Sequence, residues 1–186
     1  MRLPTLAVSA FAVLSCLPVA GCGGAPSNAP PRVAGAAYTP DARPFDPDLD
    51  ADAAVNAALA RARATDKLVL VKMGGNWCPD CRVLSGMMEV DGIDALLDER
   101  FEVVKVDVGR PVADETGGGF AGYEKNRQVA ERFGQGGFEG VPTLLIVTPE
   151  GELLNADQPS IFRNARDRDP QDLADYLYRY SAADAS

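Results

Sequence analysis

The stretch that decides the fold is Trp77-Cys-Pro-Asp-Cys81, which follows the apolar run Leu68-Val-Leu-Val-Lys-Met73 and begins a segment of helical character. Cysteines three positions apart at a helix start share its first turn, where side chains at i and i+3 are neighbours. This spacing suits a disulfide, which needs Cα atoms roughly 4.4–6.8 Å apart. A thiolate there also faces unpaired backbone N–H groups and the positive end of the helix dipole, so its pKa falls. Cys78 and Cys81 are therefore predicted to form a redox pair.

The composition narrows the chemistry available to this pair. The chain has 186 residues, 46% of them hydrophobic, which suits one domain with a real core plus a tail. A net charge of −9 argues against nucleic acid as a partner, because phosphates would be repelled. The chain has no histidine, which excludes Cys-His nucleophile systems and histidine-bound metals. We therefore expect no cofactor and no metal, and a cysteine that is activated by other means.

Residues 1–21 are expected to be an export signal. Arg2 is their only charge, and a mostly apolar stretch follows up to Ala20, which is the plan of a secretory signal. The end of this stretch, Leu17-Pro-Val-Ala-Gly-Cys22, resembles the lipobox of bacterial lipoproteins, in which the cysteine is lipidated and becomes the mature N-terminus. The resemblance implies an extracytoplasmic protein anchored in a lipid bilayer and facing the periplasm, with the outer membrane slightly favoured. Ordinary cleavage with Cys22 left unmodified and an uncleaved anchor remain open.

Residues 22–49 are expected to be a flexible or partly extended tether. They contain six prolines and many alanines, and they show little apolar periodicity. A flexible chain of this length has a typical span on the order of 30 Å. The folded domain, expected over residues 50–186, would thus stay near the membrane and still reach partners around it.

The four cysteines divide between the signal and the domain. Cys16 leaves with the signal and Cys22 takes the lipid, so that Cys78 and Cys81 are the thiols left in the mature chain. A structural disulfide is the competing explanation in an oxidising compartment. Its loop would be so small that it would restrict the unfolded chain only weakly. We therefore favour redox chemistry for the pair.

Hydrophobic periodicity and turn signals predict an alternating α/β domain. Helices are predicted over residues 51–64, 78–88, 93–99 and 128–133 and from Pro170 onward, and strands over 68–73, 101–107, 143–148 and 152–154. Residues 108–125 are expected to be a loop. The turn signal Pro149-Glu-Gly151 predicts that the last two strands form a hairpin.

The order of these elements resembles the thioredoxin fold, a central mixed sheet flanked by helices. The resemblance covers about residues 50–183 and depends on two separate segments. The first is Trp77–Cys81, and the second is Gly140-Val-Pro-Thr-Leu-Leu-Ile-Val-Thr-Pro-Glu-Gly151, which is similar to the thioredoxin stretch around its cis-proline. The two segments in this order identify the chain as thioredoxin-like.

The resemblance implies a role for each matching residue. Cys78 would be the attacking thiol, exposed at the helix start, and Cys81 the resolving thiol behind it. A substrate sulfur would form a mixed disulfide with Cys78 and be released when Cys81 attacks. Trp77 would shield the site. Pro142 would be cis and face the cysteines, and the Val141 backbone would offer hydrogen bonds to an extended substrate segment.

Three features depart from thioredoxin itself. Lys72 stands six residues before the first cysteine, where thioredoxin has an aspartate that assists proton transfer. A buried Lys72 would be a neutral base, or a charge that lowers the cysteine pKa; the commoner alternative is a strand residue with its head in solvent. Asp80 lies between the cysteines, where a carboxylate opposes thiol ionisation. The span from Asp107 to Pro142 is longer than in a minimal thioredoxin, and forms either a partner-specific loop or a surface excursion.

These observations predict a membrane-tethered thiol–disulfide oxidoreductase. Reduction is favoured over oxidation, because Asp80 disfavours a very low cysteine pKa and no histidine lies between the cysteines. The expected partners are a disulfide-containing protein substrate and a membrane thiol electron donor. One alternative is a non-catalytic module that uses the groove of the fold to bind proteins. Another is metal binding by the thiolate pair, although two thiolates alone leave a zinc site half built.

Overall fold

The structure is a computed structural model that describes residues 28–113, 115–116, 120–136 and 140–183. The expected export signal and the lipidation site at Cys22 lie outside the described residues. Within the described part of the chain, no helix has both the length and the apolar character needed to cross a membrane.

The centre of the domain is a mixed sheet in which β1 (Leu68–Gly74) lies between β2 (Phe101–Asp107) and β5 (Thr143–Val147). β2 is parallel to β1, and β5 is antiparallel to it. Every residue of β1 is buried, which explains why its sequence is almost continuously apolar rather than alternating. The expected strand over residues 152–154 is reduced to an isolated bridge between Val147 and Leu153, so the predicted hairpin is wrong in extent.

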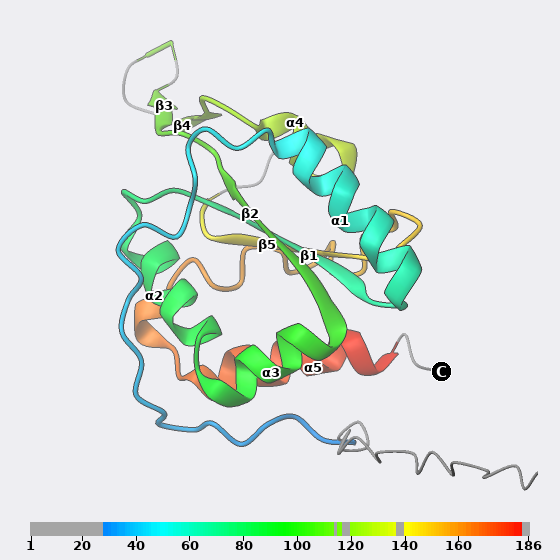
Figure 1. The fold of residues 1–186 in the computed structure, drawn as a ribbon. Helices are drawn as coiled ribbons and strands as arrows, with labels where there is room; N and C mark the ends of the chain where they lie inside the picture. Colours follow the sequence, from blue (N-terminus) through cyan, green and yellow to red (C-terminus); the bar gives the residue numbers. More distant parts are fainter. Residues whose placement is uncertain (1–27, 114, 117–119, 137–139, 184–186) are drawn as a thin grey trace, which may run out of the picture.

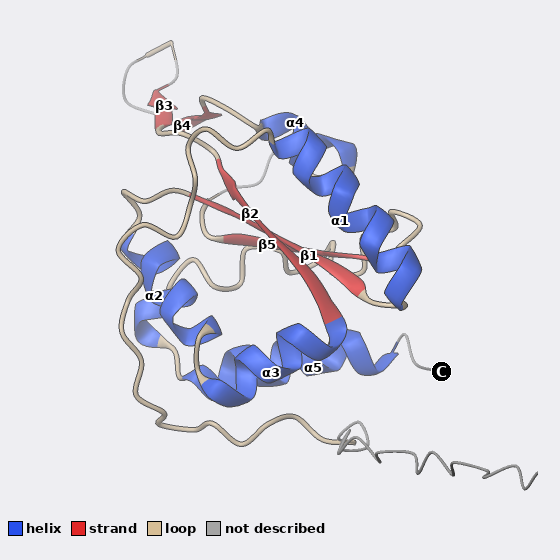
Figure 2. Cartoon of the chain, viewed as in Figure 1, coloured by secondary structure: helices blue, strands red, loops and turns tan. Residues whose placement is uncertain are grey.

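Helices cover both faces of this sheet (Figures 1 and 2). α1 (Ala51–Thr65) and the short α4 (Arg127–Arg132) lie on one face. The other face carries α2 (Pro79–Met88), α3 (Asp91–Arg100) and α5 (Pro170–Ala183). Alternate residues of β1 divide between the two hydrophobic clusters, because successive strand side chains point to opposite faces. The predicted architecture, a mixed sheet flanked by helices, is confirmed.

The segment before α1 packs against the domain instead of hanging free. We call residues 28–49 the N-terminal strap. Val33 and Phe45 of the strap are 8% and 2% exposed. The backbone N–H of Asp41 donates to the carbonyl of Arg82 in α2 at 3.0 Å. The expectation of a flexible tether up to residue 49 is therefore wrong for residues 28–49. Proline favours an extended chain, but it does not determine whether that chain stays in solvent. In the strap, buried apolar side chains such as Val33 and Phe45 hold the extended chain against the domain.

Glycine lets the strap approach α2 closely. A Cβ added at Gly86 would lie 2.2 Å from the carbonyl oxygen of Thr39. We expect Gly86→Ala to displace the strap at this point and to lower the free energy of unfolding, because overpacking usually costs about 1–3 kcal/mol. The gain in helix propensity from glycine to alanine, about 1 kcal/mol, offsets part of this cost, so that the expected net loss is up to about 2 kcal/mol.

Urea unfolding and limited proteolysis of the strap measure this effect. The control is Gly136→Ala, because a Cβ at Gly136 meets no atom within 4 Å. Unchanged stability and unchanged protease resistance in Gly86→Ala would show that the strap does not lie against α2 in solution.

The expected loop over residues 108–125 contains a small antiparallel hairpin. Its strands are β3 (Pro111–Ala113) and β4 (Phe120–Tyr123), with an irregular register between Val112 and Ala113. Strands this short give no periodicity that a sequence can reveal. The hairpin projects from the sheet at the end of the molecule where α2 begins (Figure 1).

Candidate active site: a dithiol at the start of α2

The Cys78 side chain caps the N-terminus of α2. Its Sγ accepts a hydrogen bond from the backbone N–H of Cys81 at 3.2 Å, while Pro79 occupies the first helical turn, where a missing N–H costs nothing. Both cysteines are reduced. Cys81 is fully buried, and Cys78 is only 4% exposed, which corrects the expectation of an exposed thiol. Phe45, Trp77 and Val141 form a small hydrophobic cluster with the two cysteines and cover them.

The surroundings divide the two thiols chemically. Donation from the Cys81 thiol lowers the pKa of Cys78, assisted by backbone N–H groups and opposed by burial and by the charge of Asp80. Burial raises the pKa of Cys81 strongly, and its hydrogen bond to Cys78 and the nearby charge of Cys78 raise it further. The arrangement therefore favours a thiolate at Cys78 and a protonated thiol at Cys81.

Lys72 is fully buried in the middle of β1. Its ammonium group donates to the carbonyl oxygen of Cys81 at 3.0 Å and contacts Ser85 Oγ. Burial, followed by the charge of Lys105, lowers the pKa of Lys72 from 10.5 to about 7. The alternative in which the Lys72 head reaches solvent is thus wrong. The sequence alone does not decide whether the Lys72 side chain is buried. A strand with one solvent-exposed face and a strand buried on both faces differ in what packs on the second face, and that depends on segments distant in the sequence.

Asp80 is held by an ion pair that the sequence did not predict. Its Oδ1 accepts hydrogen bonds from the backbone N–H of Arg166 at 3.0 Å and from Arg166 Nε at 3.2 Å. Arg166 lies in a short 3-10 helix, Ala165–Asp167, that packs against α2. The pairing spans 86 positions, so no local pattern signals it. Part of the negative charge that opposes ionisation of Cys78 is thereby compensated.

We expect Asp80→Asn to lower the pKa of the Cys78 thiol and to make the disulfide more oxidising. The carboxylate raises the pKa of Cys78, and an asparagine Oδ1 keeps an acceptor for the Arg166 backbone without the charge. Absorbance at 240 nm as a function of pH follows the thiolate. Arg166→Gln is the opposite control, because it exposes the Asp80 charge and should raise the Cys78 pKa. A shift in the same direction for both variants would contradict this electrostatic account.

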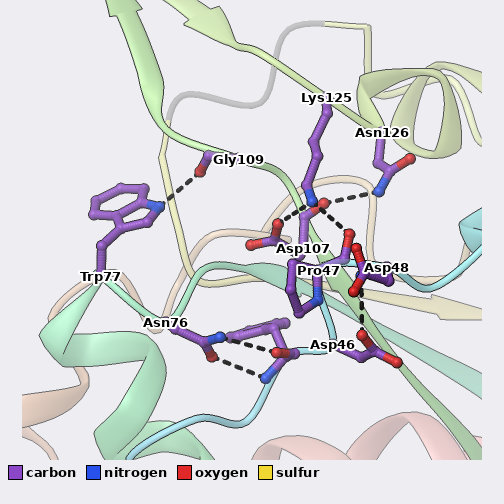
Figure 3. A network of polar contacts seen from close by, with 10 residues as sticks. Asp46, Pro47, Asp48, Asn76, Trp77, Asp107, Gly109, Lys125 and Asn126 are labelled. Atoms are coloured by element: carbon purple, nitrogen blue, oxygen red, sulfur yellow. Dashed lines mark hydrogen bonds and ion pairs between the residues drawn. The ribbon is translucent and has the colours of Figure 1, made fainter.

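The remaining predicted site residues lie around the dithiol. The Trp77 indole Nε1 donates to the carbonyl oxygen of Gly109 at 2.6 Å and thereby connects the cysteine loop to the segment that leads into β3 (Figure 3). The peptide bond between Val141 and Pro142 is cis, the conformation that the resemblance implies. The Cys78 thiol lies 3.8 Å from the Val141 carbonyl oxygen, so the proline segment faces the cysteine pair.

A polar network supports this end of the sheet (Figure 3). Lys125 forms an ion pair with Asp107 at the end of β2 and also donates to the carbonyl oxygen of Pro47 in the strap at 2.9 Å. The Asn126 amide donates to the Asp107 carbonyl at 2.8 Å. Strap, sheet and hairpin segment are thus joined beside Trp77. Among the described residues, no group of three or more potential metal ligands occurs.

Comparison with known proteins agrees with this geometry. The family profile described as thioredoxin-like matches residues 50–149, which is more than half of the chain. The chain belongs to the thioredoxin-like family.

Solved structures give a similar result. A disulphide isomerase from Xylella fastidiosa Temecula1 superposes with a TM-score of 0.63 at 29% sequence identity, over 74% of this chain and 96% of that chain. A thioredoxin from Thermus thermophilus matches at 24% identity and a TM-score of 0.45, over 67% of this chain and 82% of that one. No curated protein matches the sequence significantly. The thioredoxin-like family profile, the cysteine pair and the similarity to the disulphide isomerase support a thiol oxidoreductase at the general level.

Proposed function

We propose that this protein is a membrane-tethered, extracytoplasmic thiol–disulfide oxidoreductase that reduces protein disulfides through Cys78 and Cys81. The observation that carries the proposal is that the pKa values of two neighbouring thiols are shifted in opposite directions. The pKa of Cys78, at the start of α2, is lowered, whereas the pKa of the buried Cys81 is raised. A structural cysteine pair needs no such division.

In the first step the Cys78 thiolate attacks one sulfur of a substrate disulfide. A bond forms between Cys78 Sγ and that sulfur, the substrate S–S bond breaks, and its electron pair leaves on the second substrate sulfur, which takes a proton from solvent. The cover over Cys78 must move aside for this attack. Trp77 and the Val141 backbone lie next to Cys78 and are proposed to hold an extended substrate segment.

In the second step the Cys81 thiol gives its proton to the neutral amine of Lys72 and attacks Cys78 Sγ. The Cys78–Cys81 disulfide forms, the mixed disulfide breaks, and the substrate leaves as a thiolate that is protonated by solvent. The dithiol of the protein has been oxidised and the substrate disulfide reduced. Lys72 is suited to accept the proton because its pKa of about 7 leaves the amine largely neutral at slightly alkaline pH.

The reaction is tested by reduction of insulin with a chemical thiol donor and by equilibration with glutathione buffers. We expect catalysed insulin reduction and a reduction potential near the reducing end of the range of about −270 to −120 mV known for this fold. A potential near −120 mV would exclude the reductase version and leave an oxidase.

The similarity to a disulphide isomerase favours a second candidate, isomerisation of wrong disulfides. Isomerisation uses the same attack by Cys78 but ends when another substrate thiol, rather than Cys81, resolves the mixed disulfide. Refolding of scrambled ribonuclease by wild type and by Cys81→Ala separates the two. Reduction requires Cys81, whereas isomerisation survives its loss.

The membrane tether and the electron donor complete the proposal. Lipidation at Cys22 would hold the domain at the bilayer, and a membrane thiol carrier would reduce the Cys78–Cys81 disulfide after each cycle. Metabolic labelling with a radioactive fatty acid tests the anchor. Label in the wild type and its loss in Cys22→Ser are expected; label retained in Cys22→Ser would exclude this anchor.

A further inference from the structure

The strap reaches the dithiol through a single aromatic residue. Phe45 is 2% exposed and belongs to the same hydrophobic cluster as Cys78 and Cys81. The Asn76 side chain forms two hydrogen bonds with the backbone of Phe45. The Phe45 N–H donates to Asn76 Oδ1 at 3.0 Å, and Asn76 Nδ2 donates to the Phe45 carbonyl oxygen at 2.9 Å. Asn76 directly precedes the Trp77–Cys81 motif (Figure 3). The position of Phe45 is therefore fixed by the cysteine loop itself.

The Phe45 ring lies against the buried groups beneath the dithiol. A Cβ at Gly74 would lie 2.7 Å from Phe45 Cζ and 2.8 Å from Cys81 Sγ, so ring and sulfur meet at one point of β1. Lys72 Nζ lies 5.1 Å from the centroid of the same ring. One side chain of the strap thus covers both the Cys81 thiol and the Lys72 amine.

We propose that Phe45 is a positioning residue of the dithiol site: its ring, held by Asn76, excludes water from the buried Lys72 amine and the buried Cys81 thiol. The strap is then part of the site rather than only a link to the N-terminus. The proposal deepens the proposed function and rests on it for the step that it affects, the attack of Cys81 on the mixed disulfide.

Several charged and titratable groups face Lys72 and affect its pKa. Lys105 pairs with it in register on β2 and lowers its pKa, while Cys78 and Cys81 of α2 and Asp41 of the strap raise it. Burial is the largest cause and lowers the pKa. The Phe45 ring contributes to this burial, but its face also attracts the ammonium and so favours the charged form.

The two contributions of the ring have opposite signs, which separates them experimentally. Phe45→Ala admits water, and we expect the midpoint of the Lys72 titration to rise by at least one pH unit. Phe45→Leu keeps an apolar cover and removes only the attraction of the ring, so its midpoint should stay or fall. NMR of isotope-labelled lysine in the reduced protein reports the midpoint directly and needs no substrate.

Two further variants complete the test. Asn76→Ala removes both side-chain hydrogen bonds to the Phe45 backbone but keeps the ring, and it should also raise the midpoint of the Lys72 titration. This variant replaces Phe45→Ala as the test if Phe45→Ala does not fold. Val33→Ala truncates a buried strap residue that packs near Gly92 of α3, away from the dithiol, and should leave the midpoint unchanged. Unchanged midpoints in Phe45→Ala and Asn76→Ala would overturn the proposal, as would an equal rise in Val33→Ala.

Activity measurements distinguish failure of the proposed reductase function from failure of the proposed role of Phe45. In the reductase assay, the pH at which resolution of the mixed disulfide is half-maximal should rise with the NMR midpoint in Phe45→Ala. If the wild type reduces no disulfide but the NMR midpoint still moves, the proposed function fails and the role of Phe45 stands. If the wild type reduces insulin but the Lys72 midpoint of Phe45→Ala equals the wild-type value, the proposed function stands and the role of Phe45 fails.

Discussion

Cys81→Ala is expected to stop the reaction at the mixed disulfide and to lower turnover by on the order of 10³-fold or more, as for residues that act as a unit in covalent catalysis. Cys78 keeps its helix N-terminus and its thiolate can still attack. Its backbone hydrogen bond from residue 81 is also retained, because that bond uses the main chain. Without a second thiol, the captured sulfur cannot be displaced within the protein.

Reaction with 5,5′-dithiobis(2-nitrobenzoate) measures this directly. The reagent forms a mixed disulfide with Cys78 and releases one coloured thiolate, and attack by Cys81 releases a second. A chain of residues 23–186 contains only Cys78 and Cys81. The wild type should therefore release two thiolates for each molecule and Cys81→Ala one.

Cys78→Ser is the matched control. Cys81 is 0% exposed, so the reagent should react with it slowly even though its thiol is intact. Rapid release from Cys78→Ser would mean that Cys81 is the accessible nucleophile and that the roles are exchanged. Release of two thiolates from Cys81→Ala would contradict the mechanism altogether.

The sequence predicted those parts of the protein that depend on local signals. The cysteine pair at the start of α2, the strand β1 and the start of α5 at Pro170 follow from neighbouring residues: a cysteine spacing, an apolar run, and a capping aspartate followed by proline. The packing of the strap has no local signal, because the close approach of Thr39 to α2 depends on Gly86, which lies well outside the strap in the sequence.

The electrostatic environment of the dithiol could not be predicted in the same way. The charge of Asp80 is visible in the sequence, but its partner Arg166 approaches only when the 3-10 helix packs on α2. Phe45 has no motif of its own and reaches the cysteines through Asn76. Each of these contacts joins segments distant in sequence, and with one sequence no signal links them. The three alternatives for Lys72 differed only in such contacts.

Lys72→Met should make the protein more stable near neutral pH and remove a distinctive pH dependence. The native pKa of about 7 lies below the ordinary value of 10.5, so between these values the unfolded chain binds a proton that the native protein does not. Stability of the wild type therefore rises with pH across this window, by about 1.4 kcal/mol per unit. Below pH 7 the full cost of burying the ammonium is present.

The quantity to measure is the difference in free energy of unfolding between wild type and Lys72→Met, by urea denaturation of the reduced proteins. Other titrating groups largely cancel in this difference. Between pH 7 and 9 the advantage of Lys72→Met should shrink by roughly 2 kcal/mol, since Lys72 is already half deprotonated at pH 7 and methionine has a similar volume and no charge. Lys67→Met is the control, because the Lys67 ammonium lies at the surface on the carbonyl of Asp98, and it should keep the wild-type slope.

The same variant tests the proton transfer. With no amine to accept the Cys81 proton, resolution of the mixed disulfide should slow by about 10²–10⁴-fold, the usual contribution of a general base. The residual rate should depend on hydroxide instead of levelling off above pH 7. A flat stability difference between pH 7 and 9 would mean that Lys72 stays charged in the folded protein. In that case Lys72 would act through its charge on the thiols and not as a base, and Lys72→Met would raise the pKa of Cys78.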